Sequence, residues 1–394
     1  MTDLKLPPHL TAILNAELPR FSPAEMMRRR GAIERVMKDR GVEHLLVYGQ
    51  QRAGGAVGWL TGWPITTEAA CIVTPGRPDT MFIQFHNHVP QAKLLAPGID
   101  VKWGGPSTMQ SIAAELNTRG AASAKVGVMG PLGFSQAKGL EAACGGLVDL
   151  GRDYVGLRMV KSDEELDWIR IGAALSDAGM AALRDTLRPG VSEHELGDAI
   201  ERAYVPYGAT TVIHFIGVTP MANPSVCVPR QFTSGRRVEQ GDMAMSEISA
   251  NFWDYSGQVL RSFAVGAKPS NLHRELHDAA DAAFAAITKI LKPGVALADL
   301  IAAAKGIEDA GFTVCDDLIH GYGGGYLPPV LGSASRPAGP LPDVKLAKNM
   351  MVVVQPNVIT KDQRAGVQTG ELMLITETGC ESLHTFPRGF IEIA

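Results

Sequence analysis

The chain has 394 residues, a length sufficient for two domains that each bury a core of their own. Its formal net charge is −4 and its basic residues are not clustered, which argues against nucleic acid or an anionic membrane surface as a partner. No apolar run approaches the roughly 20 residues that span a bilayer, and the polar start Met1–Lys5 lacks the pattern of a signal peptide. We therefore expect a cytoplasmic protein.

The first part of the chain alternates helical stretches with short apolar strands, which is typical of an α/β domain. The expected strands are 44–48, 70–74, 80–84 and 125–129. A domain boundary is predicted near 157–166, where Ser162 and Glu165 form a capping-box pattern at the start of a long helix. We expect an amino-terminal domain over 1–156 and a carboxy-terminal domain over 157–394.

The carboxy-terminal part contains an internal sequence repeat. The segment Leu187–Leu196 reads LRPGVSEHEL, and Leu291–Leu300 reads LKPGVALADL. Each copy follows one amphipathic helix and opens another, so the pattern predicts a duplicated αβ unit.

Three further pieces carry the functional prediction. The first is Gly241–Glu247 with Gln258–Phe263, the second is His320–Pro329, and the third is Met350–Pro356 with Gly366–Gly379. In this order and spacing they resemble the pita-bread family of methionine aminopeptidases, proline-specific peptidases and creatinase. The resemblance implies an α/β (α+β) fold, with a creatinase-like α/β domain followed by a pita-bread domain built from duplicated αβ units.

In the metallopeptidases of this family, two metal ions are held by two aspartates, a histidine and two glutamates. The resemblance places five residues at these positions, in the order Glu247, Gln258, His320, Gln355 and Gly370. Amides bind a dication far more weakly than carboxylates, and glycine has no side chain. We therefore predict no metal and no cofactor. Glu371 adjoins the vacant last position, but it would enter the site only through a β-bulge.

The family's histidine pair is also replaced, by Arg230 and Leu327. The resemblance places Arg230 at the cavity, where its guanidinium would suit a planar anion. Glu247 and His320 are the predicted catalytic pair, with Glu247 activating water and His320 protonating the leaving nitrogen. The structural alternatives are a buried remnant for Glu247 and a support of the glycine-rich turn for His320.

Aromatic residues make up only 6% of the chain, yet several lie near these motifs. The candidates for substrate binding, besides Gln258 and Gln355 as neutral orienting groups, are Trp253, Tyr255, Tyr322, Tyr326 and His214. Ordinary core packing is the alternative. Arg336 follows the glycine-rich loop as an arginine does in creatinase. By analogy with creatinase-like dimers, we expect a homodimer in which Trp63 and Glu68 of the amino-terminal domain reach the partner's site.

Three classes of function remain open at this point. The first is a metal-independent hydrolase that cleaves a carbon–nitrogen bond in a small non-peptide substrate. The second is a lyase that performs β-elimination or retro-aldol cleavage of a small aromatic or anionic compound. The third is a non-catalytic binding protein, which we rank lowest because the chain lacks the long charged tails usual in that class.

Overall fold

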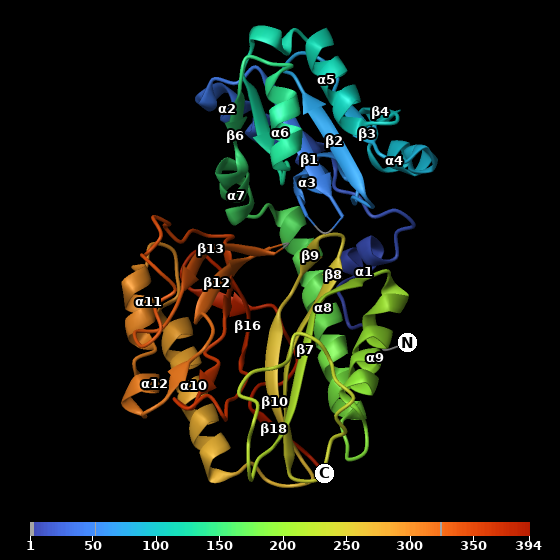
Figure 1. Cartoon of the computed structure of the whole chain (residues 1–394). Helices are drawn as coiled ribbons and strands as arrows, with labels where there is room; N and C mark the ends of the chain where they lie inside the picture. The colour runs from blue at the N-terminus through green and yellow to red at the C-terminus, as the bar shows by residue number, and fades with distance from the viewer. Residues whose placement is uncertain (1–3, 52, 324) are drawn as a thin grey trace. The chain divides into compact units, whose positions relative to one another are not determined.

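The computed structural model describes residues 4–51, 53–323 and 325–394. It divides into two compact units (Figure 1), one formed by Ala16–Arg158 and the other by the residues through Asn15 together with Met159–Ala394. The expected border at 156/157 falls inside helix α7 (Gly151–Met159). Helix α1 (Pro8–Leu14) belongs to the carboxy-terminal unit, because it packs against α8 (Asp163–Thr186).

The amino-terminal unit is built on a six-stranded sheet in the order β4-β3-β2-β1-β5-β6. The strands are β1 (His44–Gln50), β2 (Glu68–Val73), β3 (Thr80–Ile83), β4 (Asp100–Trp103), β5 (Val126–Met129) and β6 (Leu147–Asp149). The helices of this unit are α2 (Pro23–Arg40), α3 (Ala56–Thr61), α4 (Val89–Leu95), α5 (Thr108–Thr118), α6 (Phe134–Glu141) and α7 up to Arg158, with 3-10 turns η1 (His86–His88) and η2 (Ala121–Ser123). The four expected strands are present, and β1 is buried along nearly its whole length because the sheet is covered on both faces.

The carboxy-terminal unit is built on a ten-stranded sheet whose main path is β13-β12-β14-β16-β10-β8-β7. The strands on this path are β7 (Thr210–Pro220), β8 (Asp242–Phe252), β10 (Val259–Val265), β12 (Ile319–Tyr322), β13 (Tyr326–Leu331), β14 (Met351–Val354) and β16 (Gly370–Ile375). Three strands lie off this path: β9 (Tyr255–Ser256) pairs with β8, β17 (Cys380–Ser382) with β16, and β18 (Phe390–Ile393) with β10. A separate two-stranded sheet joins β11 (Thr313–Val314) to β15 (Val358–Ile359).

The helices of this unit pack on the sheet as two groups (Figure 1). They are α8, α9 (Glu193–Tyr204) and 3-10 turn η3 (Val205–Tyr207), and then α10 (Asn271–Ile290), α11 (Leu297–Ala303) and α12 (Gly306–Asp309). Helix α8 contacts β8, α9 contacts β7, and α10 contacts β14. The predicted capping box starts α8, since Ser162 Oγ accepts from Glu165 N at 3.2 Å and Glu165 Oε2 accepts from Ser162 N at 3.0 Å. None of the helices in the described ranges is long and apolar enough to cross a membrane.

The sequence repeat has matching backbone geometry in its two copies. Leu187 ends α8 with φ −65° and ψ 111°, and Leu291 ends α10 with φ −66° and ψ 109°. In both loops the glycine has a positive φ, 94° at Gly190 and 76° at Gly294, a conformation that costs glycine little. The two loops are thus the same turn built twice, as expected of a duplicated αβ unit.

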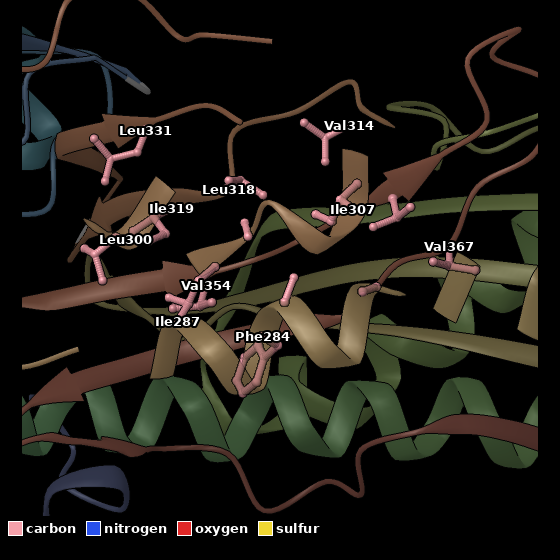
Figure 2. Close-up of a cluster of buried hydrophobic side chains, with 14 of the residues drawn as sticks. Phe284, Ile287, Leu300, Ile307, Val314, Leu318, Ile319, Leu331, Val354 and Val367 are labelled. Atoms are coloured by element: carbon pink, nitrogen blue, oxygen red, sulfur yellow. The ribbon is translucent and has the colours of Figure 1, made fainter. Parts of the chain in front are cut away.

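A cluster of buried apolar side chains supports the second half of this duplication (Figure 2). Phe284 and Ile287 of α10 lie with Leu300 of α11, Ile319 of β12 and Val354 of β14 in this cluster. Burial of such side chains supplies roughly 1.5–3 kcal/mol each. The cluster therefore fixes the two strands from which the second half of the candidate site projects.

Candidate functional site

Glu247 lies in the middle of β8, where its backbone is paired on both sides, opposite Leu260 of β10 and Phe215 of β7. Its side chain is 8% exposed and accepts a hydrogen bond from Gln258 Nε2 at 2.6 Å. Burial raises the pKa of Glu247 to about 8, and the negative charges of Asp316 and Asp317 act in the same direction. Glu247 is therefore mainly protonated at neutral pH.

Two glutamine side chains connect Glu247 to the other half of the unit. Gln258 Nε2 also lies 3.2 Å from Gln355 Oε1, and Gln355 Nε2 donates to the main-chain oxygen of Asp317 at 3.3 Å. Both glutamines are almost fully buried. A continuous chain of hydrogen bonds thus runs from β8 through Gln258 and Gln355 to the segment before β12.

His320 is fully buried on β12, and its ring is held from two sides. Nδ1 lies 3.1 Å from the main-chain oxygen of Gly321, and the ring of Tyr326 stacks on the imidazole with centroids 3.8 Å apart. Because a carbonyl oxygen only accepts, Nδ1 carries the proton and Nε2 of the neutral ring bears a lone pair. Burial lowers the pKa of His320 to about 4, while the Gln355 side chain acts in the opposite direction, and Nε2 is buried without a partner of standard hydrogen-bond geometry.

Asp316 and Asp317 also face this network, and neither was among the residues predicted from the sequence. Asp317 Oδ1 accepts from the hydroxyl of Tyr326 at 3.0 Å, so its carboxylate lies at the edge of the ring that covers His320. Burial raises the pKa of Asp316 to about 6, with a further contribution from Asp317. The signal in the sequence is an acidic pair three and four residues before His320, but nothing local shows that it turns towards Glu247.

The predicted aromatic residues divide between two places. Tyr322 is buried with its ring centroid 5.7 Å from that of His320, and its hydroxyl lies 3.0 Å from Ser256 Oγ. Tyr326 covers His320. Tyr255, by contrast, donates to Glu165 of α8 at 2.9 Å and so ties the β8–β9 hairpin to that helix. Trp253 occupies the hairpin turn with φ 50°.

The other predicted binding residues make contacts outside this network. Arg230 Nη1 lies 2.5 Å from Glu193 Oε1, so its charge is compensated within the protein. His214 Nδ1 lies 3.3 Å from Glu201 Oε1. Arg336 donates its main-chain N–H to Ser333 Oγ at 3.1 Å. Trp63 is buried in the amino-terminal unit, and its Nε1 has no hydrogen-bond partner.

Glu371 and Gly370 occupy the end of the site where the family's last metal ligand would lie. The pairing of β14 with β16 is regular, with Val354 opposite Glu371, and no bulge turns Glu371 into the network. Its carboxylate instead binds Arg261 Nη2 at 2.6 Å, and both side chains are buried. A Cβ atom at Gly370 would lie 2.5 Å from Val354 O and 2.8 Å from Gln355 Cα, so backbone fills the place of a larger side chain.

The ten-stranded sheet with its two groups of helices, and the residues placed on it, define a pita-bread protein. The chain belongs to Metallopeptidase family M24, whose model matches residues 167–377. It is 27% identical to the uncharacterised hydrolase/peptidase y4tL of Sinorhizobium fredii (strain NBRC 101917 / NGR234), over 93% of this chain and 96% of that protein. It is 22% identical to creatinase of Bacillus sp. (strain B-0618), over 94% of this chain and 93% of that one.

Solved structures show the same fold. The Xaa-Pro dipeptidase from Bacillus anthracis superposes with a TM-score of 0.79 at 20% identity, covering 93% of this chain and 100% of that one. Prolidase from Pyrococcus horikoshii OT3 gives a TM-score of 0.78 at 19% identity, covering 92% and 100%. The expected α/β fold and the family resemblance are thereby confirmed, and the chain shares its family with hydrolases.

The residues at the family's metal positions do not fit a pair of metal ions. Glu247 accepts a 2.6 Å hydrogen bond from the Gln258 amide, and Gln258 and Gln355 bind each other where two carboxylates would stand. In the described part of the chain, no group of three or more His, Cys, Asp or Glu side chains is placed to hold a metal ion. Two neutral amides and a glycine leave a divalent cation without the anionic oxygens it requires.

Proposed function

We propose that the protein is a metal-independent hydrolase that cleaves a carbon–nitrogen bond in a small, non-peptide substrate. The observation that carries the proposal is the complementary protonation of two buried groups, Glu247 on β8 and His320 on β12. Burial holds the pKa of His320 at about 4 and that of Glu247 at about 8. Between these values His320 offers a free lone pair and Glu247 offers a proton, as general base and general acid require.

This assignment reverses the roles expected from the sequence. For Glu247 to act as base and His320 as acid, Glu247 must be ionised while His320 is protonated. With pKa values near 8 and 4, only about one molecule in 10⁴ has that combination. The opposite combination predominates throughout the interval between the two values. We therefore propose His320 Nε2 as the base and Glu247 as the acid.

The reaction then follows from the positions of these protons. His320 Nε2 takes a proton from water as the water oxygen attacks the carbon of the scissile carbon–nitrogen bond. Glu247 gives its proton to the departing nitrogen, and the imidazolium returns a proton to Glu247 after the amine leaves. Gln258 and Gln355 keep Glu247 in place and provide amide groups for the charge that develops on the substrate.

Metal independence is supported by the same hydrogen bonds. In the family's metallopeptidases, the positive charge of two metal ions balances the four carboxylates among the five ligands. Here one carboxyl group remains at those positions, and its pKa is raised by burial. A protonated carboxyl group next to two amides needs no cation. Charge compensation is thus built from protons and amides rather than from metal ions.

The test is a turnover assay with protein treated with a chelator and dialysed. Creatine, N-carbamoyl amino acids, other ureido acids and Xaa-Pro dipeptides are offered with and without added Mn²⁺, Co²⁺ or Zn²⁺, and amine release is measured. We expect release from a non-peptide substrate without added metal, with limbs in the pH profile near 4 and 8. His320→Ala and Glu247→Gln should each lower kcat at least about 100-fold. Metal-dependent cleavage of the dipeptides would refute the proposal.

A lyase remains the second candidate, because the catalytic pair is dry. His320 is fully buried, and Leu327, at the position of the family's second histidine, is 3% exposed. An acid–base pair that excludes water suits elimination as well as hydrolysis. Reaction in H₂¹⁸O separates the two, since hydrolysis places ¹⁸O in the product and elimination does not.

We also propose a homodimer, by analogy with creatinase-like dimers. The expected role of Trp63 at the partner's site is not carried forward, because its side chain is only 3% exposed and is buried within its own unit. Sedimentation should give twice the chain mass. A monomer with full turnover would contradict this part of the proposal.

A further inference from the structure

Cys227 and Cys315 lie far apart in the sequence, but their side chains meet in the fold. Cys227 belongs to the connection between β7 and β8, and Cys315 directly follows β11. A hydrogen bond joins the two thiols, and both cysteines are half-buried and free of disulfide bonds. The protein thus contains a reduced pair of cysteines whose side chains are in contact.

The backbone around the pair accounts for this contact. Strand β11 pairs with β15, and Ile359 of β15 forms a further bridge to Gly366. There is no room for a Cβ atom at Gly366, because the main-chain oxygen of Cys227 occupies its place. Cys227 therefore packs on one neighbour of β15, while Cys315 extends from the other. Strand pairing holds both main chains at β15, which keeps the two thiols within reach of each other.

The hydrogen bond makes the two thiols chemically different. It lowers the pKa of the Cys227 thiol, although burial acts in the opposite direction. The same contact, together with burial, raises the pKa of Cys315. Cys227 is therefore the thiol that ionises first, and Cys315 keeps its proton beside it. A thiolate next to a protonated thiol is the arrangement in which oxidation of one sulfur is followed by disulfide formation with the other.

The other three cysteines lie in surroundings that disfavour such chemistry. Burial raises the pKa of Cys71 and of Cys380. Cys144 is buried, and its thiol donates to the main-chain oxygen of Leu140 at 3.3 Å. Because the thiolate is the form that reacts with oxidants, these three cysteines should react slowly. Cys380, which is half-buried like the pair, offers a matched control.

We propose that Cys227 and Cys315 form a site of reversible oxidation, where hydrogen peroxide converts the two thiols into an intramolecular disulfide. The Cys227 thiolate attacks one peroxide oxygen, so an S–O bond forms, the O–O bond breaks, and the released hydroxide takes up the proton that Cys227 lost. The Cys315 sulfur then attacks Sγ of Cys227, which forms the S–S bond, breaks the S–O bond and releases a second water with the Cys315 proton. In total the two thiols lose two electrons and two protons, and hydrogen peroxide is reduced to two water molecules. A small dithiol restores both thiols by exchange and is itself oxidised to a disulfide.

The position of the pair connects it with the candidate site. Cys315 directly precedes Asp316, whose charge contributes to the raised pKa of Glu247. Cys227 lies in the same connection as Arg230. The disulfide would therefore join the segment that contains Asp316 to the connection that contains Arg230. The proposal concerns the thiols alone and does not rest on the proposed reaction.

Oxidation of the full chain by hydrogen peroxide at about pH 7, followed by thiol counting and peptide mapping, tests the site. In the wild type we expect loss of two thiols per chain, a disulfide between the peptides of Cys227 and Cys315, and full recovery with dithiothreitol. Cys315→Ser removes the second thiol, so Cys227 should stop at a sulfenic acid that dimedone captures once per chain. Cys227→Ser should slow thiol loss at least about tenfold. The control Cys380→Ser should lose the two thiols at the wild-type rate.

The wild type alone also distinguishes the outcomes. Its rate of thiol loss should rise with pH around a midpoint below the value of about 8.5 that is usual for cysteine, because Cys227 ionises early. A midpoint at or above that value, a mapped disulfide between any other cysteines, or crosslinking between chains would overturn the proposal. So would undiminished thiol loss in Cys227→Ser with a circular dichroism spectrum like that of the wild type. These readouts need no substrate, so failure of the proposed hydrolysis leaves them unaffected.

Discussion

Replacement of Glu247 by glutamine should make the protein more stable, and increasingly so as the pH rises. In the folded protein burial raises the pKa of Glu247 to about 8, compared with an ordinary value of 4.5. The folded state therefore binds more protons than the unfolded state between these values, and the wild type loses stability as pH rises through that interval. A glutamine keeps the shape and the acceptor for Gln258 but does not titrate.

The expected magnitude follows from the two pKa values. Each pH unit within the interval is worth about 1.4 kcal/mol. Between pH 5 and pH 8.5, the gain in unfolding free energy of Glu247→Gln over the wild type should grow by about 3 to 4 kcal/mol, because the pKa near 8 lies close to the upper end of the range. Above pH 9 the gain should stop growing, since the carboxylate is then ionised in both states.

Urea denaturation of both proteins at half-unit steps from pH 5 to pH 9.5 measures this difference. Subtracting the unfolding free energies of the two proteins cancels the contributions of groups that titrate alike in both. Glu381→Gln, which changes an exposed carboxylate on β17, is the control and should show no such trend. A gain that varies by less than about 1 kcal/mol across the range would refute the buried, protonated state of Glu247 and, with it, the proposed role as acid.

Three further changes test other parts of the unit by the same denaturation assay. Gln258→Glu sets a second carboxyl group against Glu247, and repulsion should lower the unfolding free energy by about 2–4 kcal/mol at pH 8.5 and less at pH 5; equal losses at both would contradict this. Arg261→Met removes the close partner of buried Glu371 and leaves only the Arg388 guanidinium, 3.9 Å away, so it should cost about 3–5 kcal/mol, whereas adding Glu371→Leu should recover at least half. Burial raises the pKa of Asp177, but the charge and hydrogen bond of His384 and the hydrogen bonds from Thr385 lower it overall. Asp177→Asn should therefore cost about 2 kcal/mol at pH 7, and this loss should shrink below about pH 4; a loss that persists at pH 3 would exclude that cause.

The features that could be predicted from the sequence are those that depend on local periodicity and residue spacing. The capping box at Ser162 and Glu165 forms as expected, because both partners lie within one helical turn. The two Pro-Gly loops share backbone angles, because the same residues impose the same turn. Glu247 and His320 come from motifs whose register on β8 and β12 follows from the alternation of strand residues.

The features that sequence could not provide depend on pairing between distant segments. Arg230 lies within reach of Glu193, 37 positions earlier, and becomes a structural ion pair rather than a free anion site. Tyr255 finds Glu165 across 90 positions. The protonation state of Glu247 is equally non-local, since it depends on burial by distant segments and on the charges of Asp316 and Asp317.

The close approach of backbone at Gly370 bears on the history of this protein. Val354 O and Gln355 Cα occupy the volume that a side chain at this position would need. Restoring the family's missing glutamate would therefore require the neighbouring strand end to move as well, and Gln258 and Gln355 to change along with it. A single substitution at Gly370 is therefore insufficient to rebuild the last ligand position of the family's metal site, because the backbone of the neighbouring strand end already fills it.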